Sequence, residues 1–89
     1  MNVLEEVQEE RLNQNNKWGE QNHNPSIWLA ILAEEFGEAA KEVCEYNAVD
    51  KNLGLLVYYR LNNMRKELIQ TAAVAIQFVE SLDRNELAE

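Results

Sequence analysis

Apolar residues recur along this chain at the three- to four-residue spacing of amphipathic helices, and few helix breakers interrupt them. The chain has three glycines and one proline, and few β-branched residues alternate with a period of two. The pattern predicts an all-α fold with three main helices: Val3 to about Gln14, Pro25 to about Asn47, and Leu55 to Asp83. A chain of 89 residues is short enough to form a single domain over residues 1–89.

Local signals support the ends of these helices. Asn24 is a favoured N-cap residue, and Pro25 follows it at the first helical position, where the missing N–H costs nothing. Segment 47–54 holds two asparagines, an aspartate and a glycine, which indicate a loop. The asparagine-rich stretch around Gly19 predicts a loop between the first two helices, and the acidic tail from residue 85 is expected to fray.

The third helix is apolar on almost every side between Leu68 and Val79. A helix that is apolar all round has to be surrounded. Two partner helices in so short a chain cannot easily surround it, so the pattern favours self-association that completes a larger helical bundle. The alternative is that the alanines of this segment simply lie near the surface.

Charge and composition narrow the possible partners and location. Sixteen acidic residues against eight basic ones give a net charge of −8, which repels polyanions and argues against a nucleic-acid polymer as ligand. Cys44 is the single cysteine, so no internal disulfide forms; we expect a reducing, cytoplasmic location and a buried thiol. The longest apolar run, Ile27 to Ala33, is too short to span a membrane, so no membrane partner is expected.

Two carboxylates of the second helix lie where core residues are expected. Glu35 and Glu38 are three residues apart and share a helix face, and the same face continues back to Ile31 and Trp28. The pair therefore extends an apolar stripe. A polar pair at the same spacing on another helix would give these carboxylates a partner.

The third helix supplies such a pair in Glu67 and Gln70, on a face that continues to Val74. Buried carboxylates and amides are costly without partners. Glu35 and Glu38 facing Glu67 and Gln70 across a hard divalent cation would satisfy both helices, and Mg²⁺ prefers such oxygen ligands. A solvated acidic face is the alternative interpretation of the same residues.

The segments KWGEQNHNPSIWLAILAEEFGEAAKEV and RKELIQTAAVAIQFVE resemble the short MazG-like proteins of the all-α nucleoside triphosphate pyrophosphohydrolase superfamily. The resemblance covers roughly residues 11–82. The superfamily signature is ExxE on one helix and ExxD on the next. Glu35 and Glu38 match the first half, and Glu67 and Gln70 align with the second, with Gln70 at the position of the family's aspartate.

The resemblance implies a helical bundle that works as a dimer or tetramer. It also implies Mg²⁺-dependent cleavage of a (deoxy)nucleoside triphosphate to the monophosphate and pyrophosphate, with Mn²⁺ as a possible substitute. Glu35 and Glu38 would be catalytic and would bind the metal together with Glu67 and Gln70. Gln70 offers a neutral oxygen, which lowers the expected metal affinity, and Glu34 is a candidate for an additional carboxylate ligand.

Four further residues are candidates to bind the substrate. Lys17 and Lys66 carry charge that suits phosphates, as does Arg65, although ordinary surface charge is the alternative. Trp18, expected in the loop before the second helix, is a candidate to stack on a base, or it anchors the loop to the core. His23 in the same loop is expected to be a hydrogen-bonding residue.

Two other classes of function remain open. The chain is alternatively a helical oligomeric module that binds nucleotide or metal with little or no turnover, because Gln70 replaces an acid. A purely structural bundle with a solvated acidic face is the third possibility.

Overall fold

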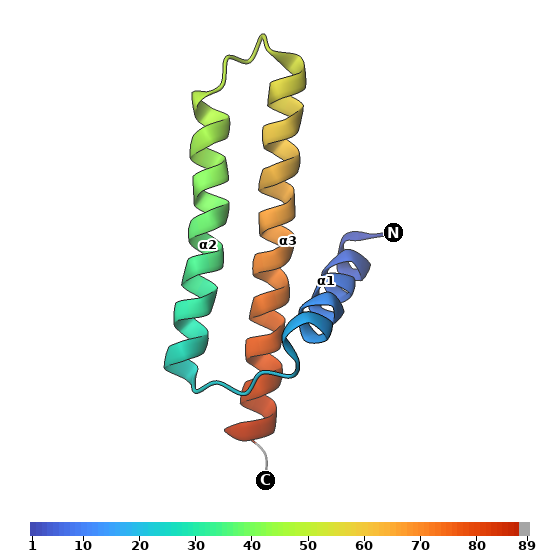
Figure 1. The fold of residues 1–89 in the computed structure, drawn as a ribbon, viewed down its shortest axis with the longest axis vertical. Coiled ribbons are helices and arrows are strands. Elements are labelled where there is room, and N and C mark those ends of the chain that lie inside the picture. The colour runs from blue at the N-terminus through green and yellow to red at the C-terminus, as the bar shows by residue number, and fades with distance from the viewer. Residues whose placement is uncertain (88–89) are drawn as a thin grey trace.

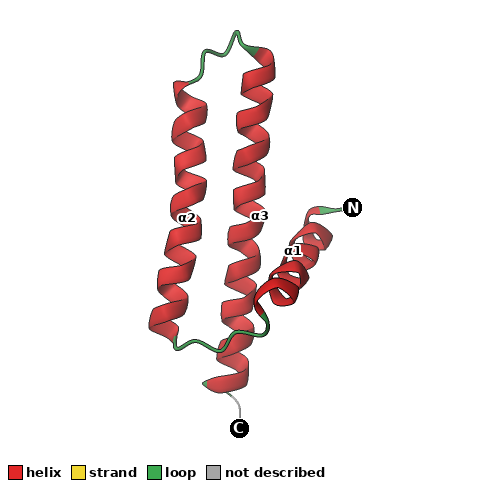
Figure 2. Ribbon diagram, in the orientation of Figure 1, coloured by secondary structure: helices red, strands yellow, loops and turns green. Residues whose placement is uncertain are grey.

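The computed structural model describes residues 1–87, and within this range the chain is all-helical and has no strand (Figure 2). Three helices follow one another: α1 (Val3–Trp18), α2 (Pro25–Ala48) and α3 (Gly54–Asn85). The predicted all-α fold is confirmed, and the predicted bounds of α2 and α3 are correct to within two residues. None of these helices is long and apolar enough to cross a membrane.

The predicted end of α1 was wrong by one turn. The helix continues through the asparagine-rich stretch because each asparagine costs only a few tenths of a kcal/mol of helix propensity. Gly19 ends it: its φ of 76° is in the region that glycine tolerates, and its N–H donates to the carbonyl of Asn15 at 2.7 Å. Trp18 is therefore the last helical residue of α1 and lies outside the loop where it was expected.

The start of α2 has the predicted cap. The Asn24 side chain accepts a hydrogen bond from the Ile27 N–H at 3.0 Å, and Pro25 occupies the first helical position. The short connection to α3 is also stabilised locally, because the Asp50 carboxylate accepts from the Asn52 N–H at 2.9 Å.

α2 and α3 form an antiparallel hairpin, and α1 lies against the C-terminal half of α3 (Figure 1). Near one end of the hairpin, the rings of Trp28 and Phe78 stack with their centroids 5.8 Å apart. Near the other end, Arg60 of α3 donates to Glu45 of α2 at 2.6 Å. These two contacts fix which residues of α2 lie level with which residues of α3.

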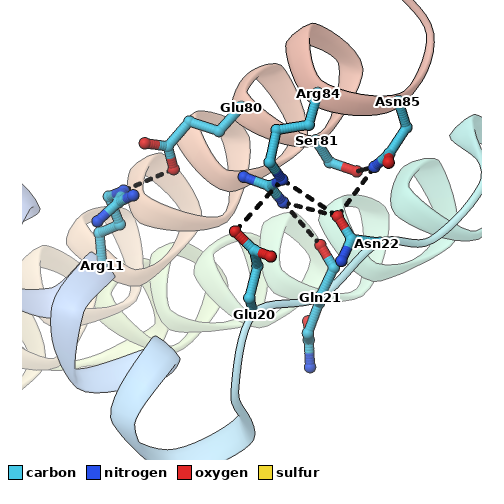
Figure 3. Close-up of polar contacts among 8 residues, drawn as sticks. All are labelled: Arg11, Glu20, Gln21, Asn22, Glu80, Ser81, Arg84 and Asn85. Carbon is cyan, nitrogen blue, oxygen red and sulfur yellow. Dashed lines mark hydrogen bonds and ion pairs between the residues drawn. The ribbon is translucent and has the colours of Figure 1, made fainter.

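The last turns of α3 hold the loop between α1 and α2 (Figure 3). Arg84 donates to the carbonyl of Gln21 at 3.1 Å and to the side chain of Asn22 at 3.0 Å, and it pairs with Glu20 at 3.4 Å. Asn85 also donates to Asn22, at 2.9 Å. The loop is thereby fixed across the end of the bundle, which sets the position of α1 relative to α2.

The core of the protomer is small. Among the described residues the buried apolar side chains are few, and the molecule is elongated, with extents of 56 × 28 × 19 Å. The buried set consists of Val7, Trp28, Ala39, Ala73 and Val74. Cys44 is exposed, so the expectation of a buried thiol was wrong. It lies about 100° around α2 from Glu45, the residue that contacts α3.

Candidate functional site

The register of the hairpin brings the two polar pairs to the same level. Glu38 lies seven residues before Glu45 on α2, and Glu67 lies seven residues after Arg60 on α3. Seven residues are close to two helical turns, so Glu38 and Glu67 lie level with each other, as Glu45 and Arg60 do. Glu35, three residues before Glu38, and Gln70, three residues after Glu67, lie level with each other in the same way. The two halves of the ExxE…ExxQ pattern therefore lie at the same level of the hairpin.

Glu35 is the most perturbed carboxylate of this region. It is half-buried, and its pKa is raised first by burial and then by the charges of Glu67, Glu34, Glu38 and Glu10. Each neighbouring carboxylate makes ionisation of Glu35 more costly. Glu35 of α2 therefore lies close enough to Glu67 of α3 for the two carboxylates to repel each other.

Glu10 of α1 was not identified from the sequence. It is one of several glutamates in the first helix, and no feature of the sequence separates it from the others. Only the packing of α1 against α3 brings it near Glu35. The cluster therefore draws carboxylates from all three helices.

A cleft runs between α1 and the hairpin as three adjoining hollows. The central hollow has a volume of about 380 Å³ and is lined by Glu10, Asn13, Gln14, Lys17, Trp18, Glu35 and Gln70. The inner hollow, of about 250 Å³, shares Gln14, Trp18 and Glu35 with it and reaches Trp28 and Gln77. The outer hollow, of about 390 Å³, shares Glu10, Asn13 and Gln70 and reaches Arg65 and Lys66. Together they have the size of a small-ligand site.

The structure gathers some of the predicted site residues and leaves others outside the cleft. Lys17, Trp18, Glu35 and Gln70 line the central hollow, and Lys66 lines the outer one. None of the three hollows is lined by the remaining predicted ligands, which are Glu34, Glu38 and Glu67. Glu34 and Glu38 are exposed, whereas Glu35 is half-buried.

The basic residues of the cleft differ in whether their charge is already used in an ion pair. Arg65 forms a two-pronged ion pair with Glu6 of α1, and the hydrogen bonds from Arg65 lower the pKa of Glu6. This pairing fits a structural role in holding α1. Lys17 lies 4.9 Å over the ring of Trp18, and neither Lys17 nor Lys66 forms an ion pair within residues 1–87. These two ammonium groups are the ones available to an anionic ligand.

Several side chains around Glu35 offer oxygen ligands. The carboxylates of Glu35 and Glu10 and the amide of Gln70 line the same hollow as the Lys17 ammonium, and carboxylate and amide oxygens are ligands that suit Mg²⁺ or Mn²⁺. In the part of the chain that the structure describes, no three acidic, histidine or cysteine side chains converge as a preformed metal cage. The acidic and amide residues of the hollow thus fit a hard cation by the type of ligand they offer.

Comparison with known proteins adds nothing to this picture: no family model, no curated protein and no solved structure matches the chain significantly.

Proposed function

We propose that this chain is a Mg²⁺-dependent nucleoside triphosphate pyrophosphohydrolase of the MazG-like type, which works as a cytoplasmic homodimer or homotetramer. The observation that carries the proposal is the central hollow. It places a half-buried carboxylate of raised pKa, Glu35, beside Gln70, Lys17 and Trp18. Acid, amide, ammonium and aromatic groups in one cleft match the phosphate, metal and base of a nucleotide. The MazG-like resemblance names Glu35, Glu38, Glu67 and Gln70 on α2 and α3, and two of these, Glu35 and Gln70, line the hollow.

The metal would be held by Glu35 and Gln70, with Glu38, Glu67 and Glu34 as further ligands and Glu10 beside them. When bound, Mg²⁺ supplies neutralisation of the phosphate charge. Lys17 and Lys66 bind phosphate oxygens from the central and outer hollows, and Trp18 stacks on the base. These contacts hold the triphosphate along the cleft.

A carboxylate carries out the proton transfer. Glu35 orients a water molecule and takes its proton as the water oxygen bonds to the α-phosphorus, and the bond from that phosphorus to the bridging oxygen breaks. Pyrophosphate leaves and the nucleoside monophosphate remains. Glu35 suits this role better than the exposed Glu38 because a raised pKa makes a carboxylate a stronger base.

Pyrophosphate release from a panel of ribo- and deoxyribonucleoside triphosphates, with Mg²⁺ or Mn²⁺, tests the proposal. We expect release with at least one member of the panel, equimolar production of the monophosphate, and complete loss with EDTA. Absence of turnover across the panel, at millimolar metal and micromolar protein, would reject the enzyme.

A second candidate function is a nucleotide- or metal-binding module with little turnover. The observation that favours it is Gln70, a neutral ligand where an acid would bind metal more strongly. In that case nucleotide with Mg²⁺ raises the melting temperature, because the ligand binds the native state, yet no pyrophosphate appears.

Replacing Gln70 by Asp tests the role of this position directly. The new carboxylate adds a charge beside Glu35 and Glu10, so the metal-free protein should lose stability, by about 1 kcal/mol. With Mg²⁺ the same carboxylate becomes a charged ligand, so the variant should show a larger metal-induced rise in melting temperature than the wild type. Activity at low Mg²⁺ should also rise. Melting curves in EDTA and in Mg²⁺ measure both effects.

Gln8→Asp is the matched control, because Gln8 is exposed on α1 and lines none of the three hollows. It introduces the same change in charge and helix propensity and should shift the melting temperature equally in both buffers. If Gln70→Asp behaves like this control, Gln70 does not belong to the metal site.

A further inference from the structure

The last turn of α1 carries two of the groups that complete the cleft, but it is not packed against the helix on the other side. Lys17 and Trp18 line the central hollow together with Glu35 of α2 and Gln70 of α3. Within residues 1–87, α1 packs against α3 alone and makes no packing contact with α2. The width of the cleft is therefore set by the contacts that hold α1 to α3 and by the loop that joins α1 to α2.

The polar contacts between α1 and α3 stop one turn before the end of α1. The last of them is the hydrogen bond that the buried Gln77 donates to Gln14. Among the described residues, no hydrogen bond or ion pair joins α3 to the four α1 residues that follow Gln14. Trp18 is 64% exposed, so burial holds its side chain only weakly. The last turn of α1 thus depends on what holds the chain after it.

Arg84 of α3 holds the chain directly after this turn (Figure 3). Its guanidinium donates to the Gln21 carbonyl at 3.1 Å and to the Asn22 side chain at 3.0 and 3.1 Å, and it pairs with Glu20 at 3.4 Å. The pair with Glu20 contributes little by itself, since both side chains are partly exposed to solvent. The planar guanidinium, however, binds a backbone oxygen and a side-chain oxygen at once, which fixes the direction of the segment as well as its position.

Gly19 is the single residue between the last turn of α1 and the segment that Arg84 holds. Its φ of 76° lies in the region that favours glycine, and nothing apart from its chain neighbours lies within 4 Å of the position that a Cβ would take. No packed side chain therefore fixes the direction of the chain at this residue. The direction of the last turn of α1 depends instead on where residues 20–22 are held.

We propose that Arg84 is a positioning residue of the cleft: by holding residues 20–22 it keeps Lys17 and Trp18 where they bind one ligand together with Glu35. This inference rests on the proposed function, in which Lys17 binds phosphate and Trp18 stacks on the base. Arg84 lines none of the three hollows, so it acts through the loop and not on the ligand. Glu35 lies on α2, which packs directly against α3, so the chemical step should not depend on Arg84.

The kinetics of Arg84→Ala test the proposal, with Mg²⁺ and the nucleotide of the panel that the wild type cleaves fastest. KM should rise at least about fivefold, because the ligand then has to order the last turn of α1 as it binds. kcat should stay within about twofold of the wild-type value, because Glu35 keeps its place. A loss that appears mainly in kcat, or a KM within about twofold of the wild-type value, would overturn the proposal.

Lys51→Ala is the matched control. Lys51 also holds a loop by donating to backbone carbonyls, those of Tyr46 and, at 2.9 Å, Val49, but it does so at the opposite end of the hairpin (Figure 1). The variant loses the same charge and a comparable set of loop contacts. It should keep the KM and the kcat of the wild type.

Variants of Asn22 separate this contact from a general loss of stability. Asn22→Asp keeps the side-chain oxygen that accepts from Arg84 and should have the KM of the wild type, whereas Asn22→Leu removes that oxygen and should raise KM. Combined in one chain, Asn22→Leu and Arg84→Ala should raise KM by less than the product of the single effects, because they break the same contact. Single effects that multiply in full would contradict the proposal. The two Asn22 variants decide the question alone if Arg84→Ala does not fold.

Amide hydrogen exchange of the free protein tests the same contact without nucleotide. In Arg84→Ala the amides of residues 17–19 should exchange at least about threefold faster than in the wild type, whereas those of residues 7–12 should keep their rates. Unchanged exchange at residues 17–19 would reject the role of Arg84 even in a chain that cleaves nucleotide. If the wild type binds a nucleotide without turnover, the dissociation constant takes the place of KM. A wild type that binds no member of the panel would reject the proposed function, and this proposal with it.

Discussion

Replacing Glu35 by Gln should lower the rate of pyrophosphate release at least about a hundredfold at saturating Mg²⁺ and nucleotide, because loss of a general base typically costs this much or more. Glu35 is the only one of the four predicted glutamate ligands that lines the central hollow, and its pKa is raised by burial and by its acidic neighbours. The neutral amide keeps the size of the side chain but accepts no proton. Single-turnover measurement of pyrophosphate release separates this loss from weakened binding.

Two comparison variants sharpen the result. Asp83→Asn makes the same change of charge on the exposed end of α3 and should leave the rate unchanged. Glu38→Gln should reduce the rate through weaker metal binding, so that higher Mg²⁺ restores much of it. If higher Mg²⁺ restores Glu35→Gln to the same degree, Glu35 is a metal ligand only, and the base lies elsewhere.

Glu35→Gln should also change how the stability of the metal-free protein depends on pH. Because the pKa of Glu35 is higher in the folded chain than in the unfolded one, the ionised carboxylate costs stability at neutral pH. The cost disappears as the pH falls below both pKa values, where the group is protonated in both states. The variant should therefore melt higher than the wild type in EDTA at pH 7. The difference should vanish toward the acidic end of the series.

Replacing Trp28 by Ala should destabilise the protomer by about 3–5 kcal/mol, the range for large aromatic residues in protein cores. Trp28 is 1% exposed, stacks on Phe78 and meets the edge of His23 at a centroid distance of 5.1 Å. It joins α2 to α3 and to the loop that leads from α1. Since the core contains few other large buried side chains, the lost contacts have no substitute. Urea denaturation at one fixed protein concentration measures the change.

Trp28→Phe separates the contribution of the aromatic ring to stability from that of the indole N–H. The indole N–H is buried and has no hydrogen-bond partner among the described residues, so its removal forfeits no bond and relieves an unpaired donor. We expect Trp28→Phe to cost less than about 1.5 kcal/mol, the usual range for apolar replacements that nearly conserve volume. A loss as large as that of Trp28→Ala would mean that the N–H is paired in solution.

The sequence determined the helices and the polar pairs that α2 and α3 bring together. The Asn24 cap, Pro25 and the loop residues after position 47 are local signals, and they act within a few residues of the bonds they control. The three-residue spacing of Glu35–Glu38 and Glu67–Gln70 is equally local, because it sets which side chains share a helix face. Such features are visible in a single chain without knowledge of its packing.

Only the tertiary structure decided where these faces lie relative to α1 and to solvent. The proximity of Glu10 to Glu35 and the lining of the cleft by Lys17 and Trp18 depend on which side of the hairpin α1 occupies. The exposure of Cys44 depends on which side of α2 packs against α3. Periodicity identifies a face as apolar but not what covers it. Helix packing joins residues far apart in sequence, and many pairings of faces bury similar areas. The choice among them depends on contacts such as Trp28–Phe78 and Gln14–Gln77, which no local pattern specifies.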